Sequence, residues 1–260
     1  MATKINLVKK IKVKDAVMFT GLPGIGLVGK IAVDYMLKQF KAEKIAEIYS
    51  DSFPPSIHTR NSLIELIKDE LYHYKFQGKD YLFLAGPVQP SLDIRFGSAQ
   101  EHYEFAEAIV REAKKLGVKE IYTLAGINVG EKRMNAQPKI VIAATNKKII
   151  QEFKKLNATE GQEEGLISGA AGLIIGIAAE EGIHGACLMG ETNARLIYGD
   201  HGSAQKLIEL LVKKFKFKVN MDEIGKESKN IEQAFQQLSK QLEEEQQEQL
   251  PPDSSLSYVR

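Results

Sequence analysis

The spacing of hydrophobic residues changes repeatedly along the chain, and the changes predict strands that alternate with helices. Short apolar or alternating runs predict the strands. They lie at Ile5–Val13, Ala16–Thr20, Lys44–Tyr49, Ser62–Ile67, Glu70–Phe76, Asp80–Ala85, Val118–Ala125, Lys139–Ala144 and Ile183–Met189. The first run alternates apolar and basic residues, as a half-exposed edge strand does.

Longer segments with apolar residues three and four positions apart predict helices between these strands. They lie at Gly26–Phe40, Ser98–Leu116, Asn146–Leu156, Ile167–Glu181 and from Asp200 or Ser203 to about Lys214. The fourth has Gly, Ala and Ile on all sides, which is typical of a helix buried between layers. This order of elements predicts a three-layer α/β/α domain with a mixed sheet.

The pattern changes after Val219, where single apolar residues follow a near-heptad spacing in a polar segment. They are Ile224, Ile231, Phe235, Leu238 and Leu242. A helix with so narrow a stripe can pack back onto the body, or it can join another chain as a coiled coil. We therefore expect a core domain (1–218), a helical arm (219–250) whose last four apolar positions form an oligomer seam, and a flexible tail (251–260).

Composition and charge narrow the class of protein. The chain has 260 residues and 43% hydrophobic content, enough for a substantial core, and a net charge of +1. Residues 219–260 contain nine acidic and four basic residues, a net charge of −5, which leaves +6 for the body. A nearly neutral total predicts neither a nucleic acid nor a membrane as partner.

The single cysteine, Cys187, excludes an intrachain disulfide and favours a reducing, cytoplasmic setting. It lies in an apolar strand, where a thiol is more often inert than nucleophilic. The longest apolar run, Ala170–Ala179, is shorter than the roughly 20 residues that span a bilayer. The histidines show no metal-ligand spacing, and we expect neither a metal nor a cofactor.

A glycine-rich turn follows the strand Ala16–Thr20 and opens the next helix. Its glycines and proline are Gly21, Pro23, Gly24, Gly26 and Gly29. Such a turn suits positive φ angles, close backbone approach or an anion at the helix N-terminus. The spacing matches a dinucleotide fingerprint, with Asp51 about 20 residues further on. From Gly24 to Lys30 it also matches a P-loop, but Ile31 replaces the Ser or Thr that would hold magnesium. A purely structural turn remains a third interpretation.

Polar residues follow several predicted strands at the end where open α/β sheets bind ligands. Asn128, Arg133, Glu191 and Asn193 could line a pocket there. The sequence offers no acid, base or nucleophile with an evident partner, and no Gly-x-Ser-x-Gly elbow. These residues therefore favour a binding protein over an enzyme.

Beside the turn Gly21-Leu-Pro-Gly-Ile-Gly-Leu-Val-Gly29, the chain carries three short motifs. They are Gly86-Pro87, Tyr122-Thr-Leu-Ala-Gly126 and Gly165-Leu-Ile-Ser-Gly-Ala-Ala-Gly172. Together these motifs resemble the proteasome assembly chaperone family, especially its archaeal members, over roughly residues 16–211. The departure is Asp200-His-Gly-Ser203, where the family would have an Asp-Pro step.

The resemblance implies a fold similar to nucleoside phosphorylases without their catalytic residues. It also implies a non-enzymatic homo-oligomer that binds the proteasome core particle or its α subunits. Partners that dock on the core particle resemble one another in a C-terminal hydrophobic-Tyr-any motif. This chain ends in Tyr258, Val259 and Arg260, which places the tyrosine one position early. We expect these three residues to form a partner-binding tail.

Two hypotheses from different classes follow. The first is a non-enzymatic proteasome assembly chaperone or proteasome-binding factor. The alternative is a nucleotide- or nucleoside-binding enzyme that uses the turn Gly24–Lys30.

Overall fold

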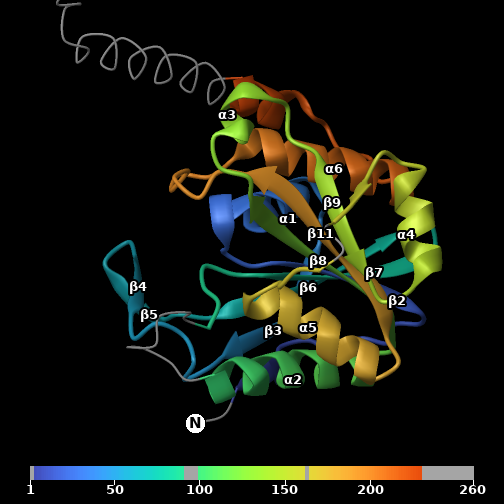
Figure 1. Ribbon diagram of the computed structural model, residues 1–260. Helices are drawn as coiled ribbons and strands as arrows, with labels where there is room; N and C mark the ends of the chain where they lie inside the picture. Colours follow the sequence, from blue (N-terminus) through green and yellow to red (C-terminus); the bar gives the residue numbers. More distant parts are fainter. Residues whose placement is uncertain (1–2, 91–98, 162–163, 230–260) are drawn as a thin grey trace, which may run out of the picture.

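The computed structural model describes residues 3–90, 99–161 and 164–229 (Figure 1). Nine strands form one sheet in the order β1-β3-β6-β7-β2-β8-β11-β9-β10. They are β1 (Lys4–Leu7), β2 (Ala16–Gly21), β3 (Glu43–Tyr49), β6 (Asp69–Phe76), β7 (Lys79–Ala85), β8 (Val118–Asn128), β9 (Ile140–Ala144), β10 (Thr159–Glu160) and β11 (His184–Thr192). The strands β4 (Ile57–Arg60) and β5 (Leu63–Leu66) form a separate two-stranded ribbon.

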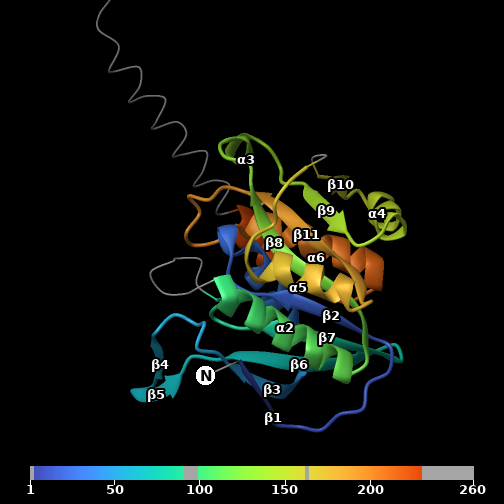
Figure 2. The ribbon, with the colours of Figure 1, turned by 60° about the horizontal axis from the view of Figure 1, so that its bottom comes forward.

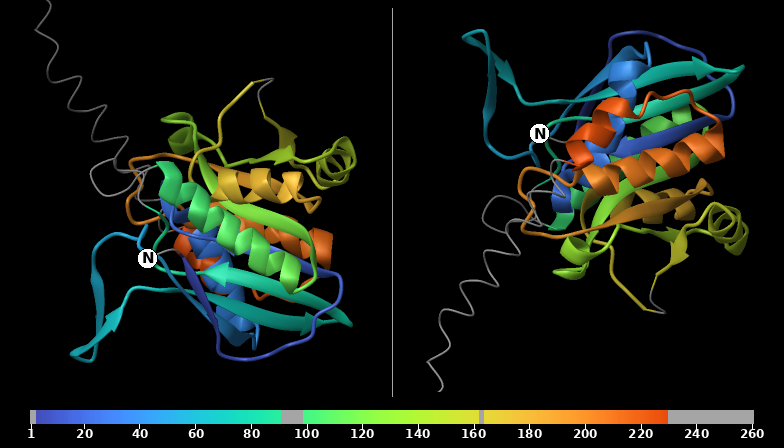
Figure 3. Two further views of the ribbon diagram at one scale, coloured as in Figure 1. Left: turned by 90° about the horizontal axis from the view of Figure 1, so that it is seen from below. Right: turned by 90° about the horizontal axis from the view of Figure 1, so that it is seen from above.

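The helices lie on both faces of this sheet. They are a 3₁₀ turn η1 (Ile25–Leu27), α1 (Val28–Gln39), α2 (Ala99–Lys115), α3 (Lys132–Asn135), α4 (Lys147–Lys154), α5 (Gly169–Glu180) and α6 (His201–Phe215), and residues 222–229 are also helical. Figure 1 shows α1 and α6 on one face and α2 and α5 on the other. Figure 3 views the two faces in turn. The prediction of a mixed sheet between helices is confirmed.

The sheet is parallel at its centre and antiparallel outside it. Strands β7, β2, β8 and β11 are parallel neighbours, whereas β6, β3 and β1 add antiparallel pairs on one side and β9 does so on the other. Every residue of β2 is buried, as expected of a strand covered on both faces. The hairpin between β6 and β7 turns at Gln77 and Gly78, which both have positive φ.

An aromatic cluster fills the core on the α1 and α6 face. Phe19 on β2 stacks on Phe83 with ring centroids 5.2 Å apart and meets the edge of Phe217 at 6.0 Å. Phe217 follows α6, so residues beyond the helix predicted to end near Lys214 complete this core. The Tyr35 hydroxyl donates to the Asn220 carbonyl at 2.7 Å, and Ile224 is fully buried.

The structure corrects several predicted elements. The first strand ends at Leu7 rather than Val13, and residues 8–15 contain no strand. The predicted strand Ser62–Ile67 pairs with β4, which the sequence pattern missed, instead of entering the main sheet. Strands β8 and β11 run on to Asn128 and Thr192, into segments that we expected to be loops.

The helix Ile167–Glu181 is present as α5 but is not buried on all sides. It lies beside α2 on the outside of the sheet (Figure 2). Ala170, Ile174 and Ala178 face the core, whereas Gly176 is exposed and Ile177 is half-buried. A Cβ on Gly172 would stand 2.0 Å from the Ile167 carbonyl oxygen, and one on Gly176 would meet nothing within 4 Å, so the small residues of this helix do not indicate a second covering layer.

The ribbon of β4 and β5 projects away from the body (Figures 1 and 2). Pairing of Ile57 with Leu66 and of Thr59 with Ile64 places these four side chains on one face of the ribbon. All four are solvent-exposed. A two-stranded ribbon is at best marginally stable alone, so this face lacks the cover that such a ribbon normally needs.

Candidate functional site

The glycines of the turn allow α1 to lie directly on the sheet. A Cβ on Gly29 would stand 2.0 Å from the Leu124 carbonyl oxygen, and one on Gly21 would stand 2.4 Å from the Gly29 oxygen. Gly26 has φ +61° and faces Thr192, whose Oγ1 would lie 2.4 Å from an added Cβ. At these three positions an added Cβ would collide with other atoms of the protein, so packing within the protein is enough to require glycine there.

The other two turn residues are less constrained. Gly24 has extended backbone before η1, and a Cβ there would meet nothing within 4 Å. Pro23 lies between the end of β2 and that position, where it is half-buried. The turn therefore contains both packed and open glycines.

The lysine of the P-loop interpretation, Lys30, lies away from the turn. Its Nζ donates to Asp34 at 2.6 Å and to the Gly86 carbonyl at 3.2 Å, at the end of β7. A P-loop lysine must instead reach phosphates held in the loop. The turn thus has the spacing of a P-loop without its geometry.

The acid of the dinucleotide interpretation, Asp51, follows β3. Strands β7 and β6 separate β3 from β2, so Asp51 is three strand positions from the turn rather than on the neighbouring strand. Neighbouring strands are about 4.8 Å apart, which puts β3 roughly 14 Å from β2. The fingerprint requires the acid to reach a ribose bound beside the turn.

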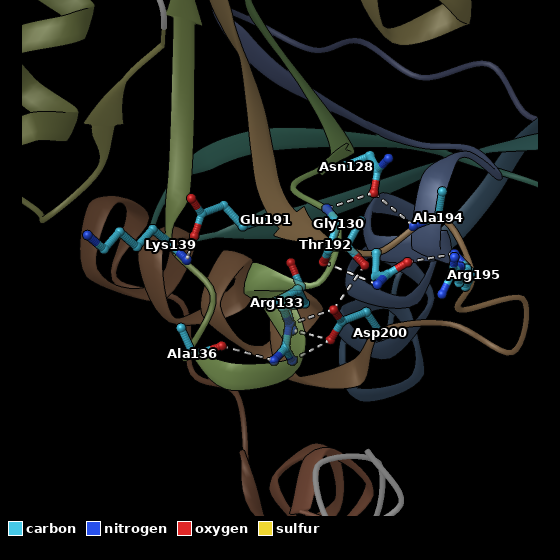
Figure 4. A network of polar contacts seen from close by, with 12 residues as sticks. Asn128, Gly130, Arg133, Ala136, Lys139, Glu191, Thr192, Ala194, Arg195 and Asp200 are labelled. Atoms are coloured by element: carbon cyan, nitrogen blue, oxygen red, sulfur yellow. Dashed lines mark hydrogen bonds and ion pairs between the residues drawn. The ribbon is translucent and has the colours of Figure 1, made fainter. Parts of the chain in front are cut away.

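A buried ion pair lies where the parallel strands end (Figure 4). Arg133 on α3 donates from Nε and from one terminal nitrogen to the two oxygens of Asp200, each at 2.8 Å. The side chains are 2% and 0% exposed. Asp200 also accepts from the Thr192 hydroxyl at 2.9 Å and from the Ser203 backbone N–H at 2.9 Å, which caps α6.

Two asparagines hold the loops around this pair (Figure 4). The Asn128 Oδ1 accepts from the backbone N–H groups of Gly130 and Ala194, at 3.1 and 3.0 Å. Asn193 donates to the Gly130 carbonyl at 3.1 Å and accepts from the Arg195 N–H at 2.9 Å. We call this arrangement, together with Arg133, Thr192 and Asp200, the strand-end network.

Glu191 lies at the edge of the network on β11. It accepts from the Lys132 ammonium at 2.9 Å and from the Lys139 N–H at 3.0 Å. The four residues predicted to line a pocket, Asn128, Arg133, Glu191 and Asn193, are therefore gathered at one end of the sheet. Their polar atoms bond to backbone groups and to the charged side chains of Lys132 and Asp200, which gives these residues a structural role.

Thr192 and Asp200 escaped the sequence analysis as members of this network. Asp200 was predicted only as a possible helix start, and its capping of Ser203 agrees with that. No local pattern indicates that Arg133, 67 residues earlier, would reach it. Only the packing of β8 beside β11 brings the two together.

A charged groove of about 730 Å³ lies between α1 and the ribbon. Four lysines line it, each paired with a carboxylate: Lys30 with Asp34, Lys38 with Glu223, Lys44 with Glu47 and Glu70, and Lys68 with Glu47. The hydrogen bond from Lys44, followed by that from Lys68, lowers the pKa of Glu47 to about 2. The four lysines of the groove are thus all paired with carboxylates.

Asp69 is buried at the start of β6, just after the ribbon. Neither carboxyl oxygen has a hydrogen-bond partner. Burial raises the pKa of Asp69 well above its usual value, although the Val88 backbone and the Lys30 charge act in the opposite direction. A Cβ on Gly86 would stand 1.7 Å from its Oδ1, so the carboxyl group is tightly enclosed.

The remaining candidate chemistry is limited. Cys187 is fully buried, and burial raises the pKa of its thiol to about 11, which agrees with the prediction of an inert side chain. Within residues 3–90, 99–161 and 164–229, no cluster of three or more His, Cys, Asp or Glu side chains could hold a metal ion. In the same ranges no helix is long and apolar enough to cross a membrane.

Two predicted sites lie outside the described residues. They are the oligomer seam of Ile231, Phe235, Leu238 and Leu242, and the tail residues Tyr258, Val259 and Arg260. Both stay predictions.

Residues 18–239 match the model of the PAC2 family. An uncharacterized protein of Methanocaldococcus jannaschii, MJ1210, is 33% identical over 259 residues, which cover 95% of this chain and 96% of that protein. A second protein of the same organism, MJ0106, is 24% identical over 245 residues and 93% of each chain.

Among solved structures, the chain is similar to Pyrococcus furiosus PbaB, described as an archaeal proteasome activator. The identity is 28%, the TM-score is 0.82, and the match covers 92% of this chain and 99% of PbaB. It also shares its fold with Pyrococcus furiosus PbaA, an archaeal homolog of proteasome-assembly chaperone, at 22% identity, a TM-score of 0.71, and coverage of 95% and 96%.

Proposed function

The chain belongs to the PAC2 family, and on this premise we propose that it is a non-enzymatic factor that binds the proteasome core particle or its α subunits. The resemblance to archaeal proteasome assembly chaperones, predicted from the glycine motifs, is confirmed by the family match and the similar structures. The observation that carries the proposal is the similarity to an archaeal proteasome activator along nearly the whole length of both chains. The proposal places the protein in the cytoplasm.

The charged groups at the strand ends and near the glycine turn are bonded within the protein, which supports a binding role over a catalytic one. Arg133 and Asp200 are the most enclosed charges at the strand ends, and they satisfy each other. Lys30 is bonded at the end of β7, away from the glycine turn. A catalytic group needs a partner and access to a substrate, and neither the network nor the turn supplies both.

The alternative of a nucleotide- or nucleoside-binding enzyme has no specific support in this geometry. The packing of Gly21, Gly26 and Gly29 accounts for the turn without a ligand. In calorimetric titrations with ATP, adenosine and phosphate, we expect no saturable heat of binding. Saturable binding that is lost in a Lys30→Ala variant would instead support the hypothesis of a nucleotide-binding enzyme.

The proposal includes a homo-oligomer. The exposed apolar face of the ribbon supports it, because Ile57, Ile64 and Leu66 would be covered in an assembly. The seam Ile231–Leu242 is the second candidate interface. Light scattering on the protein with Ser at Ile231, Phe235, Leu238 and Leu242 should give a lower mass than the unmodified protein. An unchanged mass would show that the seam does not hold the oligomer together.

The C-terminal residues Tyr258, Val259 and Arg260 are proposed to enter pockets of the core particle through their side chains and terminal carboxylate. Short tails are captured in this way, and several tails on one oligomer would act together. Deletion of Asp253–Arg260 should weaken binding to the core particle without changing the stability of the body. Equal binding would contradict the role of the tail.

The central experiment mixes the full-length protein with proteasome α subunits and, separately, with assembled core particle. Co-migration and a joint mass by light scattering are expected with at least one of them. A complex with free α subunits indicates an assembly chaperone, and a complex with the core particle alone indicates an activator. Absence of both complexes would refute the proposal.

A further inference from the structure

The exposed apolar side chains gather at one end of the molecule. In the described residues eleven large apolar side chains are exposed. Eight of them lie at the end of the sheet where the parallel strands finish: four are on the ribbon, and the others are Ile25, Leu166, Ile197 and Tyr198. We call these eight residues the carboxyl-end face. Single exposed apolar residues are common on a surface, but such a gathering marks an interface.

The contacts of the neighbouring segments place each part of this face at the same end of the sheet. Ile25 follows β2, and Ile197 and Tyr198 follow β11. The ribbon borders a groove that the residues directly after β7 also line. Leu166 lies just before α5, whose first turn donates to the Gln89 side chain, also after β7, at 3.3 Å. The ribbon and the loop after β11 lie toward the same side of the body in Figures 1 and 2.

The described start of the arm runs toward the carboxyl-end face. Glu223 pairs with Lys38 at 2.7 Å, near the end of α1 that is remote from this face. Four residues later, the Glu227 carboxylate lies 3.2 Å from Nε2 of His201, which is the first residue of α6 after β11. The helix of residues 222–229 therefore points past the carboxyl-end face at Lys229, where the described residues end.

One side of this helix packs on its own body, and the seam continues that side. Ile224 is fully buried and Ser228 is 6% exposed. From Ile224, steps of four and three residues lead through Ser228 to the four apolar residues of the seam. In a helix these positions share one side, so the seam faces the side on which the body lies, beyond the end of that body.

The seam cannot turn back onto the face of its own copy. No Gly or Pro interrupts residues 226–250, so the sequence predicts that the helix continues. Its 21 residues after Lys229 would reach about 31 Å beyond the body. A surface that covers the seam must therefore stand in front of the carboxyl-end face.

A second copy supplies such a surface. The seam and the carboxyl-end face are both apolar and belong to one chain, so in a two-fold pair each arm can cover the face of the other copy. Charge favours the same arrangement, because residues 219–260 carry a net charge of −5 and the remainder carries +6. The arm of one copy is thus attracted to the body of another.

We propose that two copies pair end to end, and that the seam of each arm covers the carboxyl-end face of the other copy. This inference rests on the homo-oligomer of the proposed function and names the two surfaces that form it. The exposed apolar side of the ribbon then belongs to the covered face.

The first measurement is the dissociation constant of the pair, determined by analytical ultracentrifugation of full-length variants. The face variant carries Ile64→Ser and Ile197→Ser, and the seam variant carries Phe235→Ser and Leu238→Ser. Each should raise the dissociation constant about 30-fold, the loss typical of residues that dominate an interface. The control variant carries Leu7→Ser and Val8→Ser, which are exposed at the other end of the sheet, and should stay within about 3-fold.

The decisive measurement mixes the face variant with the seam variant. Neither pairs well alone, because both contacts of the pair are broken in each case. A mixed pair keeps one intact contact, between the unmodified seam of the face variant and the unmodified face of the seam variant. The mixture should therefore pair more tightly than either variant alone, and this recovery also shows that both variants are folded.

Other outcomes overturn the inference. If mixing restores nothing, seam binds seam or face binds face, and the exchange of arms is wrong. If the control variant loses as much as the face variant, the carboxyl-end face has no special role. If the four substitutions on one chain weaken pairing far more than either double variant, seam and face belong to separate contacts.

The outcomes also separate this inference from binding to the proteasome. An unmodified protein that sediments as a monomer refutes the pair, whereas co-migration with the core particle, measured separately, would still support the proposed partner. Recovery on mixing without any complex with core particle or α subunits would support the pair and refute the proposed partner.

Discussion

The loop 194–199 and the ribbon of β4 and β5 both present large apolar side chains to solvent, but they are supported in different ways. The loop is tied to buried Asp200 and to Asn128, whereas the ribbon is connected to the body mainly through its own main chain. A fixed loop loses little entropy on binding, while a ribbon without support can adapt its position. Equal exposure therefore does not imply equal function.

The largest expected effect comes from breaking the support of the loop. Asp200→Ala leaves the Arg133 charge buried without a partner and removes the cap of α6, so the free energy of unfolding should fall by about 3–5 kcal/mol. Urea denaturation measures it. Hydrogen exchange should accelerate in residues 194–199 and not in the ribbon.

The matched control is an exposed ion pair between Glu131, directly before α3, and Arg195 in the loop, whose charged atoms lie 3.4 Å apart. Glu131→Gln should change the free energy of unfolding by about 1 kcal/mol or less. If Asp200→Ala costs no more than Glu131→Gln, the buried pair does not anchor the loop.

A second variant acts on the turn against which the loop rests. Gly29→Ala forces a Cβ to within 2.0 Å of the Leu124 carbonyl oxygen, so α1 must shift. The free energy of unfolding should fall by about 1–3 kcal/mol, measured by chemical denaturation. Gly24→Ala is the control, since its Cβ meets nothing within 4 Å. Equal losses in both variants would contradict the packing role of Gly29.

A third variant lies at the start of β6, just after the ribbon. It should raise the free energy of unfolding at neutral pH, whereas the first two variants lower it. Burial raises the pKa of Asp69 in the folded state, so the folded state holds its proton more tightly than the unfolded chain does. Stability that is present below about pH 4 should therefore decrease as the pH rises through the folded-state pKa. Asp69→Asn should flatten this dependence and stabilise the protein at neutral pH.

The measurement for Asp69 is the free energy of unfolding between pH 4 and 8, compared with that of the unmodified protein. Glu131→Gln serves again as the control, because the Glu131 side chain is 73% exposed. A pH dependence that is identical in the Asp69→Asn variant would rule out Asp69 as its source.

The smallest expected effect lies on the ribbon itself. Ile64 is 71% exposed, so Ile64→Ser should change the unfolding free energy of the monomer by no more than about 0.5 kcal/mol. A drop above about 2 kcal/mol, measured at several protein concentrations, would show that Ile64 is covered in solution. A drop that grows with protein concentration would support the ribbon as an oligomer interface, whereas a drop that does not depend on concentration would contradict the exposure of Ile64 in the monomer.

Much of the fold is predictable from sequence because the signals are local. The strand Ala16–Thr20 is apolar up to Phe19, and the turn at Gln77 and Gly78 fixes the register of β6 and β7. The predicted convergence of Asn128 and Asn193 followed from the rule that parallel strands end together. The strand and the hairpin depend on neighbours in the chain, whereas the convergence of the two asparagines depends on a general rule for parallel strands.

The features that escaped prediction depend on contacts between distant segments. Leu63–Leu66 has the pattern of any strand, and nothing in it states that its partner is β4 rather than the main sheet. The pairing of Arg133 with Asp200 is set by the approach of β8 to β11. Likewise, Lys30 fits a phosphate loop in spacing, and only the position of Gly86 shows where its ammonium lies.

The contacts of Phe217 with Phe19 carry a consequence for synthesis on the ribosome. The central strand leaves the exit tunnel early, but the ring that closes its aromatic cluster is translated almost 200 residues later. Pairings so distant in sequence form slowly, and an incomplete nascent chain exposes apolar surface meanwhile. The core on the α1 face of the sheet cannot be completed until nearly the whole chain has emerged. We propose that this protein assists the assembly of another complex, and yet its own core stays unfinished through most of its translation.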